Sequence, residues 1–258
     1  MTQHHGARQP ESREPLLRLW HIDLDAQGDR LDAREASERW LSQSERNAEA
    51  SPEALAPGRE RTLRRRRARI ALRILLSREG VIAARGTPLP LRPGGKPALP
   101  YENGTLDFSL SYSGSHCLVA IGTPAPIGVD LERPRDVAIN ANRRALIVAA
   151  GCALVPRKPL PRDDQTGFIA AWTRLEAFAK ARGDGIGKLL ETLGMTARGA
   201  ATLTPVDANS RAAALLADSG LALTDIEVPT PGIAALAAPS EAVAVRSPCA
   251  PVDFRAEF

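Results

Sequence analysis

Hydrophobic residues recur at helical spacing between residues 59 and 79, and a glycine follows where a helix commonly ends. The members of this apolar stripe are Leu63, Ile70, Ala71, Ile74 and Leu75. The segment "GRERTLRRRRARIALR" at 58–73 also carries eight arginines, which fall on the flanks of the stripe. The pattern predicts a helix that buries one face and carries a dense row of positive charge beside it.

Strand patterns follow this helix. Residues 106–122, "LDFSLSYSGSHCLVAIG", alternate and then become continuously apolar, which predicts a strand, a Ser/Gly turn and a second strand. The turn signal "TPAP" at 123–126 leads into "IGVDLE" at 127–132, which predicts a third strand.

A second amphipathic stripe lies in the segment 165–187, and Gly183 falls at the expected helix stop. The residues of the stripe are Phe168, Ala171, Trp172, Leu175, Phe178 and Ala179. The order of helix, loop, antiparallel strands and helix predicts an α+β fold and not a series of βαβ units. The last seventy residues are alanine-rich and show only faint strand patterns.

Composition limits the class of protein. The chain has 258 residues, 43% hydrophobic and 25% charged, as in an ordinary globular protein. No apolar segment has the length of a signal peptide or a membrane helix, so we expect a cytoplasmic protein without a membrane partner. Cys117, Cys152 and Cys249 lie far apart, which favours reduced structural thiols over a disulfide framework or a zinc site.

The net charge of +4 is concentrated in the arginine segment. A run of charges is commonly only a solvated helix face, and the alternative is a site for phosphates or an acidic partner. The run has no interleaved aromatic residues and matches no DNA-binding motif, so we expect no nucleic-acid partner.

Two acids end the strand at 127–132. Asp130 and Glu132 are two residues apart, so in a strand both carboxylates point to one face and are able to grip one hard cation. Glu176 and Lys180 lie four apart on the helix over 165–187. One interpretation is a simple ion pair between them. In the other, Glu176 is a third oxygen ligand for Mg²⁺ and Lys180 contacts the phosphates that Mg²⁺ carries.

One lysine has an unusual setting in the segment 85–105. This segment is dense in proline and glycine, which predicts a surface loop, and it holds Lys96 between Gly95 and Pro97. A lysine on such a loop suits a phosphate contact, although any exposed loop lysine has the same signature.

These motifs together resemble the Sfp-type 4′-phosphopantetheinyl transferases, which activate carrier proteins of fatty-acid, polyketide and nonribosomal-peptide synthesis. The resemblance spans about ninety residues in the middle of the chain. It rests on "GGKP" at 94–97, "FSLSYS" at 108–113, "IGVDLE" at 127–132 and "WTRLEAFAKARGDG" at 172–185, in the order of the family.

The resemblance implies a pseudo-twofold pair of similar α+β halves, residues 1–124 and 125–258, with coenzyme A in the cleft between them. It implies that Asp130, Glu132 and Glu176 hold Mg²⁺. Lys96, Ser111 and Lys180 are then expected to contact the coenzyme phosphates. Arg64 is expected to bind the 3′-phosphate, with Arg46 as a weaker candidate, and Tyr112 replaces a histidine that meets a coenzyme phosphate in the family.

The implied activity is that of a holo-[acyl-carrier-protein] synthase. A serine of an apo acyl or peptidyl carrier protein attacks coenzyme A and releases 3′,5′-ADP, with Glu176 and Lys180 as catalytic residues and Glu176 as a candidate base. We expect a monomer. The alternative is a non-catalytic relative that binds coenzyme A or a carrier protein. Leu175 stands where the family has a lysine, and the helical stripe predicts that it is buried, with Arg174 on the flank opposite Glu176.

Overall fold

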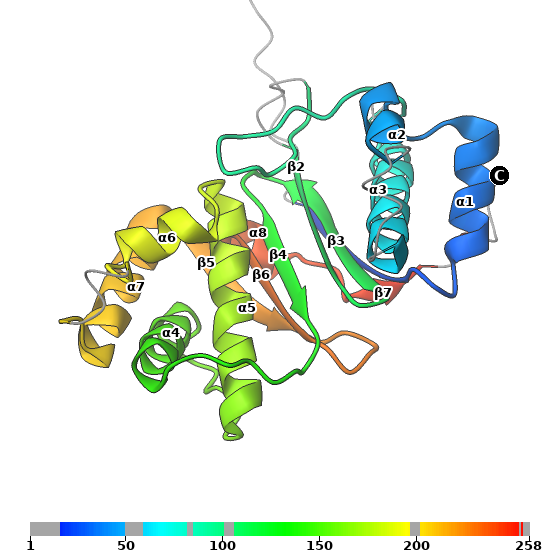
Figure 1. Ribbon diagram of the computed structural model, residues 1–258. Coiled ribbons are helices and arrows are strands. Elements are labelled where there is room, and N and C mark those ends of the chain that lie inside the picture. The colour runs from blue at the N-terminus through cyan, green and yellow to red at the C-terminus, as the bar shows by residue number, and fades with distance from the viewer. Residues whose placement is uncertain are drawn as a thin grey trace, which may run out of the picture.

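The computed structural model describes residues 16–49, 59–81, 85–100, 106–196, 202–252 and 254. Two sheets lie face to face, and helices cover the outer side of each sheet, so the chain forms four layers (Figure 1). The fold is therefore a mixture of helices and mainly antiparallel strands, as the sequence pattern predicts.

The first sheet has the strand order β2-β3-β1-β7. Its strands are β1 (Leu16–Asp23), β2 (Asp107–Ser113), β3 (His116–Thr123) and β7 (Ala250–Pro251). β2 and β3 form the predicted hairpin, and β1 pairs antiparallel with β3. β7 returns from the C-terminal part of the chain and pairs in parallel with β1, so the two ends of the described chain share one sheet.

Three helices connect β1 to β2 and cover the outer face of this sheet (Figure 1). They are α1 (Gly28–Glu38), α2 (Gln43–Glu49) and α3 (Arg59–Arg78). α3 confirms the helix predicted over 59–79, and Gly80 follows with a left-handed φ of 83°. Ile70, Ile74 and Leu75 of its stripe lie in one hydrophobic core with Phe108 and Val119 of the sheet.

The second sheet has the order β4-β6-β5, and all its pairings are antiparallel. Its strands are β4 (Gly128–Glu132), β5 (Leu221–Ile226) and β6 (Ile233–Pro239). The helices of this part are α4 (Ala141–Leu154), α5 (Asp164–Arg182), α6 (Ile186–Thr192), α7 (Pro205–Ser219) and α8 (Ser240–Ala244). The last seventy residues thus contribute two full strands of this sheet.

α5 packs directly on β4, and a glycine makes this approach possible. Asp163 caps the start of the helix by accepting a hydrogen bond from Thr166 N, and Gly183 ends it with a φ of 77°. A Cβ atom at Gly128 would lie 2.1 Å from the carbonyl oxygen of Ala177, so no larger residue fits there. The glycine of "IGVDLE" therefore lets the helix that carries Glu176 lie against the strand that carries Asp130.

A third hydrophobic core fills the space between the two sheets. Leu17, Leu19 and Leu118 of the first sheet meet Val129 and Leu236 of the second. Since strand residues alternate between faces, Asp130 points away from this core and toward α5.

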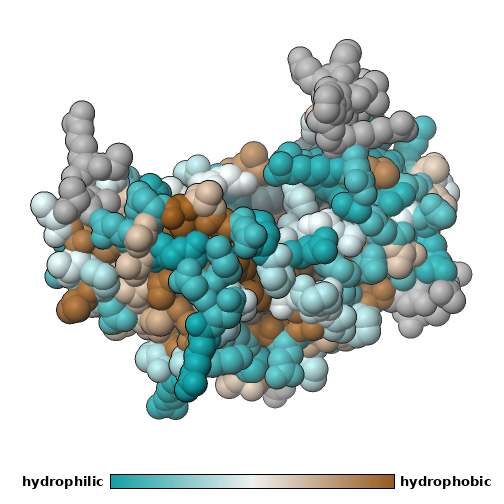
Figure 2. All heavy atoms as spheres, turned by 60° about the horizontal axis from the view of Figure 1, so that its bottom comes forward, coloured by the Kyte–Doolittle hydropathy of each residue, from teal (hydrophilic) through white to brown (hydrophobic). Residues whose placement is uncertain are grey.

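The surface agrees with a globular chain. No helix within the described ranges is long and apolar enough to cross a membrane. On the face in Figure 2, hydrophilic residues predominate and hydrophobic residues form separate small patches. The three cysteines are free, as predicted, and Cys117 is buried.

Candidate active site

Polar side chains of β2 hold β4 in place where the two sheets meet. Asp107 accepts a hydrogen bond from Ile127 N (2.8 Å), Ser109 from Val129 N (3.0 Å) and Ser113 from Arg133 N (3.1 Å). These side chains are two and four residues apart, which are even spacings, so they all project from the same face of β2. They satisfy N–H groups of β4 and of the residues that flank it, on the edge where no strand of the described residues pairs with β4. They thereby fix the position of the acids that β4 carries.

The carboxylate of Asp130 is buried at the centre of this region, with 4% of the residue exposed. Its Oδ1 accepts hydrogen bonds from Ser111 Oγ (2.8 Å) and from Lys180 Nζ (2.7 Å). Its Oδ2 is also buried, and no hydrogen-bond partner for it exists among the described residues. A buried carboxylate oxygen without a donor is costly, which marks Oδ2 as a position for a cation or a donor that arrives with a ligand.

Glu132 lies two residues along the strand and is more exposed. It accepts hydrogen bonds from both terminal nitrogens of Arg135, and Ser113 Oγ donates to Glu132 Oε2 (3.3 Å). The hydrogen bond and the charge of the carboxylate raise the pKa of Arg135. An arginine therefore already neutralises Glu132.

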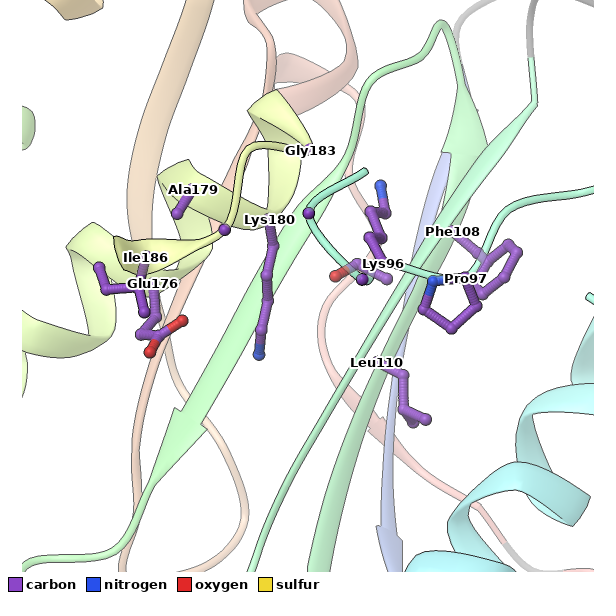
Figure 3. A pocket seen from close by; sticks show the side chains of 13 residues that line it. Lys96, Pro97, Phe108, Leu110, Glu176, Ala179, Lys180, Gly183 and Ile186 are labelled. Carbon is purple, nitrogen blue, oxygen red and sulfur yellow. The ribbon is translucent and has the colours of Figure 1, made fainter. Parts of the chain in front are cut away.

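Glu176 and Lys180 project from α5 on the side of β4. Figure 3 shows both side chains reaching from the helix toward the same side. Burial, followed by the charge of Asp130, raises the pKa of Glu176 to about 7, although Lys180 acts in the opposite direction. Glu176 forms no hydrogen bond within the described part of the chain, so its carboxyl group is available to a ligand.

A cavity of about 340 Å³ opens beside these two residues. Glu176, Lys180 and Gly183 line it from the helix, and Gly94 and Lys96 line it from the loop between α3 and β2. The loop touches the end of α5, because a Cβ atom at Gly94 would lie 2.1 Å from the carbonyl oxygen of Gly183. The "GGKP" motif thus forms one wall of the cavity.

Lys96 differs from the exposed loop lysine that the sequence led us to expect. Its ammonium group is buried and donates to Asp107 Oδ2 (2.5 Å) and to the carbonyl oxygen of Ile127 (2.6 Å). Burial lowers its pKa, and the charge of Asp107 offsets part of that effect. Figure 3 shows its side chain pointing away from those of Glu176 and Lys180. The last five residues of the predicted loop 85–105 lie outside the described residues.

Arg64 and Tyr112 line a second, polar cavity of about 410 Å³, together with Arg61, Glu132 and Arg135. The structure therefore brings these two predicted residues to one place. Arg64 is already paired, because Nη2 donates to Asp25 Oδ2 (2.6 Å) and to Glu60 Oε1 (2.5 Å), and the hydrogen bond to Asp25 raises the pKa of Arg64. A bound phosphate would have to replace these acids.

Tyr112 also lines a third cavity of about 400 Å³, between α3 and the loop that carries Gly95. Arg65 and Arg69 border this cavity. The weaker candidate Arg46 donates to the carbonyl oxygen of Leu41 and to Gln43 Oε1 (3.2 Å) on α2. Residues of β2 line all three cavities, which border Glu176, Glu132 and arginines of α3.

Two buried arginines were missed by sequence reasoning. Arg73 of α3 is 1% exposed and donates to Glu45 (2.7 Å) and to the carbonyl oxygen of Thr87 (2.8 Å). Arg174 of α5 is fully buried and makes two hydrogen bonds of 2.8 Å with the carboxylate of Asp225. Their acidic partners lie far away in the sequence, so no local pattern identifies either pair.

Leu175 is fully buried in the core of the second sheet, as its helical stripe predicts. Arg174 points to Asp225 on β5, on the side opposite Glu176, and it therefore does not replace a lysine beside Glu176. Lys180 is the lysine that α5 brings to the acids.

The predicted metal ligands converge only in part. Across the described ranges, no three acidic, histidine or cysteine side chains are arranged closely enough to hold a metal ion. Instead, Lys180 forms an ion pair with Oδ1 of Asp130, and Arg135 forms one with Glu132. The set of Asp130, Glu132 and Glu176 remains a prediction that requires these cations to move.

Comparison with known proteins agrees with the motifs. No protein-family model matches the chain. Over 122 residues, the chain is 33% identical to a protein of Synechocystis sp. named "Putative 4′-phosphopantetheinyl transferase". This match supports membership of the 4′-phosphopantetheinyl transferase family. The aligned part covers 46% of this chain and 48% of the relative, so the match spans about half the length of each protein. The similarity to the phosphopantetheinyl transferase is therefore partial.

Proposed function

We propose that this protein transfers the 4′-phosphopantetheine group of coenzyme A to a serine of an apo acyl or peptidyl carrier protein and releases 3′,5′-ADP. The observation that carries the proposal is the buried Oδ2 of Asp130, which has no hydrogen-bond partner among the described residues. Lys180, which contacts the other oxygen of this carboxylate, lines a cavity together with Glu176. The similarity to a protein named as a phosphopantetheinyl transferase supports the same reaction class.

Asp130 and Glu176 have the chemistry to bind a divalent cation such as Mg²⁺, although no three such side chains lie close together among the described residues. Mg²⁺ prefers carboxylate oxygens, and Asp130 offers a buried oxygen without a donor while Glu176 forms no hydrogen bond in the described chain. Asp130 and Glu176 would hold the ion, with Glu132 as a third ligand when Arg135 moves away. When bound, the ion neutralises negative charge on the pyrophosphate of the coenzyme.

The protein's own residues supply the other parts of the reaction. The carrier serine Oγ forms a bond to the β-phosphorus of coenzyme A, and the bond from that phosphorus to the bridging oxygen breaks. Glu176 is the candidate acceptor of the serine proton, because it lines the cavity and its carboxyl group has no hydrogen-bond partner among the described residues. Lys180 donates to a phosphate oxygen, and Ser111 orients the carboxylate of Asp130.

We propose that coenzyme A lies along β2, between two similar halves at residues 1–124 and 125–258. In each half a first strand is followed by helices and then by two further strands. The orders β2-β3-β1 and β5-β6-β4 correspond, which supports a pseudo-twofold relation. The 3′-phosphate would bind at the polar cavity of Arg64 and Tyr112. We expect the enzyme to act as a cytoplasmic monomer.

The test is a carrier-loading assay. The protein is incubated with an apo carrier protein, coenzyme A and Mg²⁺, and the carrier is weighed for added phosphopantetheine. Asp130→Ala should lower the transfer rate at least a hundredfold, equivalent to about 2.7 kcal/mol of barrier, while the fold persists. A rate within tenfold of wild type would reject the role of Asp130. Coenzyme binding without loading of any carrier would favour the non-catalytic alternative.

A further inference from the structure

Asp130 is neutralised by a cation that the protein itself provides. Lys180 Nζ lies 2.7 Å from Oδ1 of Asp130 and 3.0 Å from Ser111 Oγ. No other contact of this ammonium group exists among the described residues. The Lys180 side chain is 27% exposed, whereas the Asp130 side chain is 6% exposed, so the lysine side chain has access to solvent and its partner does not.

A divalent cation and this ammonium group cannot share Asp130 without repulsion. The two positive charges would both lie within hydrogen-bonding or coordination distance of a single carboxylate, in a region of low solvent access. Only Oδ2 of that carboxylate lacks a partner, and it is fully buried. A cation that binds there must therefore weaken or break the contact between Lys180 and Oδ1.

The geometry points to Lys180 as a displaceable cation that, in the ligand-free protein, neutralises the carboxylate to which the metal would bind. In this arrangement Lys180 and the divalent cation compete for Asp130. The released ammonium group turns to the phosphates of the coenzyme, which accept it in place of the carboxylate. The inference rests on the proposed function, because it takes the ligands of that site to be a divalent cation and a phosphate-bearing coenzyme.

Lys180 then couples the two ligands. Without coenzyme A, a metal ion has to remove Lys180 from Asp130, its one acidic hydrogen-bond partner among the described residues, so the metal binds weakly. With coenzyme A, the phosphates receive Lys180 and the metal binds more tightly. Because binding equilibria are linked, the metal must strengthen coenzyme binding by the same factor. The protein thus avoids holding either ligand firmly without the other.

The experiment measures binding of Mn²⁺ to the free protein by electron paramagnetic resonance, without coenzyme or carrier. Lys180→Met should bind Mn²⁺ at least fivefold more tightly than wild type, because the competing ammonium group is gone. Lys188→Met is the matched control, because Lys188 is an exposed lysine that pairs with Glu191 on α6. It should bind Mn²⁺ as wild type does. The double variant Asp130→Asn/Lys180→Met should not show the tighter Mn²⁺ binding of Lys180→Met, because it lacks the Asp130 carboxylate.

Equal or weaker Mn²⁺ binding by a folded Lys180→Met variant would overturn the inference. Undetectable Mn²⁺ binding by wild type and by every variant would overturn it as well. If the methionine variant does not fold, Lys180→Gln keeps a hydrogen-bond donor for Asp130 and should show a gain in the same direction. Circular dichroism checks the fold of each variant.

A second titration tests the coupling. Coenzyme A should tighten Mn²⁺ binding at least fivefold more in wild type than in Lys180→Met, and an equal effect in both would refute the transfer of Lys180 to the phosphates. Carrier loading by wild type is measured separately. Carrier loading without competition between Lys180 and Mn²⁺ would support the proposed function and reject the inference. Competition without carrier loading would support the inference and reject the proposed function.

Discussion

Replacing Glu176 with glutamine should stabilise the metal-free protein at pH 8 and change its stability little at pH 5. Burial and the charges of Asp130 and Glu132 raise the pKa of Glu176 from 4.5 to about 7 in the folded protein. The folded chain therefore keeps this proton at pH values where the unfolded chain has lost it. Stability falls as the pH rises from about 4.5 to about 7, and the destabilisation is complete above that range.

The size of the effect follows from the change in pKa. A pKa that rises from 4.5 to about 7 corresponds to at most about 3–4 kcal/mol of unfolding free energy. Glu176 is partly exposed, so solvent screens the repulsion, and we expect about 1–2 kcal/mol. Glutamine has nearly the same shape and no charge, so it removes the destabilisation caused by the ionised carboxylate without leaving a cavity.

Urea unfolding in the presence of a chelator, at pH 5 and at pH 8, measures this difference. Glu227→Gln serves as the control, because Glu227 is an exposed glutamate that follows β5. A change in unfolding free energy that is the same at both pH values would refute the reasoning, and so would a loss of stability at pH 8. Added Mg²⁺ should stabilise wild type more than Glu176→Gln, because the variant has lost one charged ligand.

Two further substitutions test the buried ion pairs. Arg174→Ala should cost about 3 kcal/mol in urea unfolding, since it leaves Asp225 without its main partner, whereas Arg162→Ala at an exposed position should cost less than about 0.5 kcal/mol. Lys96→Met should likewise cost about 2–4 kcal/mol, because Asp107 is 2% exposed and its nearest remaining cation would be Arg92 at 3.6 Å, beside the hydrogen bond from Ile127 N. Unchanged stability together with a loss of coenzyme A binding in calorimetry would instead assign Lys96 to the phosphates.

Local patterns predicted the elements around the site. The arginine helix, the hairpin of β2 and β3, the strand with Asp130 and the helix with Glu176 all appear where their periodicity places them. β1 was not predicted, and the region of β5 and β6 showed only faint strand patterns. The β6 segment "IAALAAP" is largely alanine, which has a low strand propensity, and it becomes a strand because it is buried between β4 and β5.

The helix start at Thr204 shows a signal that sequence reasoning overlooked. Thr204 and Asp207 form a capping box, and Pro205 follows the cap. Together with Gly220 after the last turn, these residues mark both ends of α7. The pattern is local, so it was available in the sequence.

The sequence by itself determined which residues share a face. Asp130 and Glu132 lie on one face of a strand, and Leu175 lies inside a helical stripe, because side-chain direction follows from the period of each element. The tertiary structure alone decided which charges meet. Lys180 reaches Asp130 from fifty residues away, Lys96 turns inward to Asp107, and Arg174 finds Asp225. Ion pairs depend on distances between elements, and those distances arise only when the two sheets and α5 pack together.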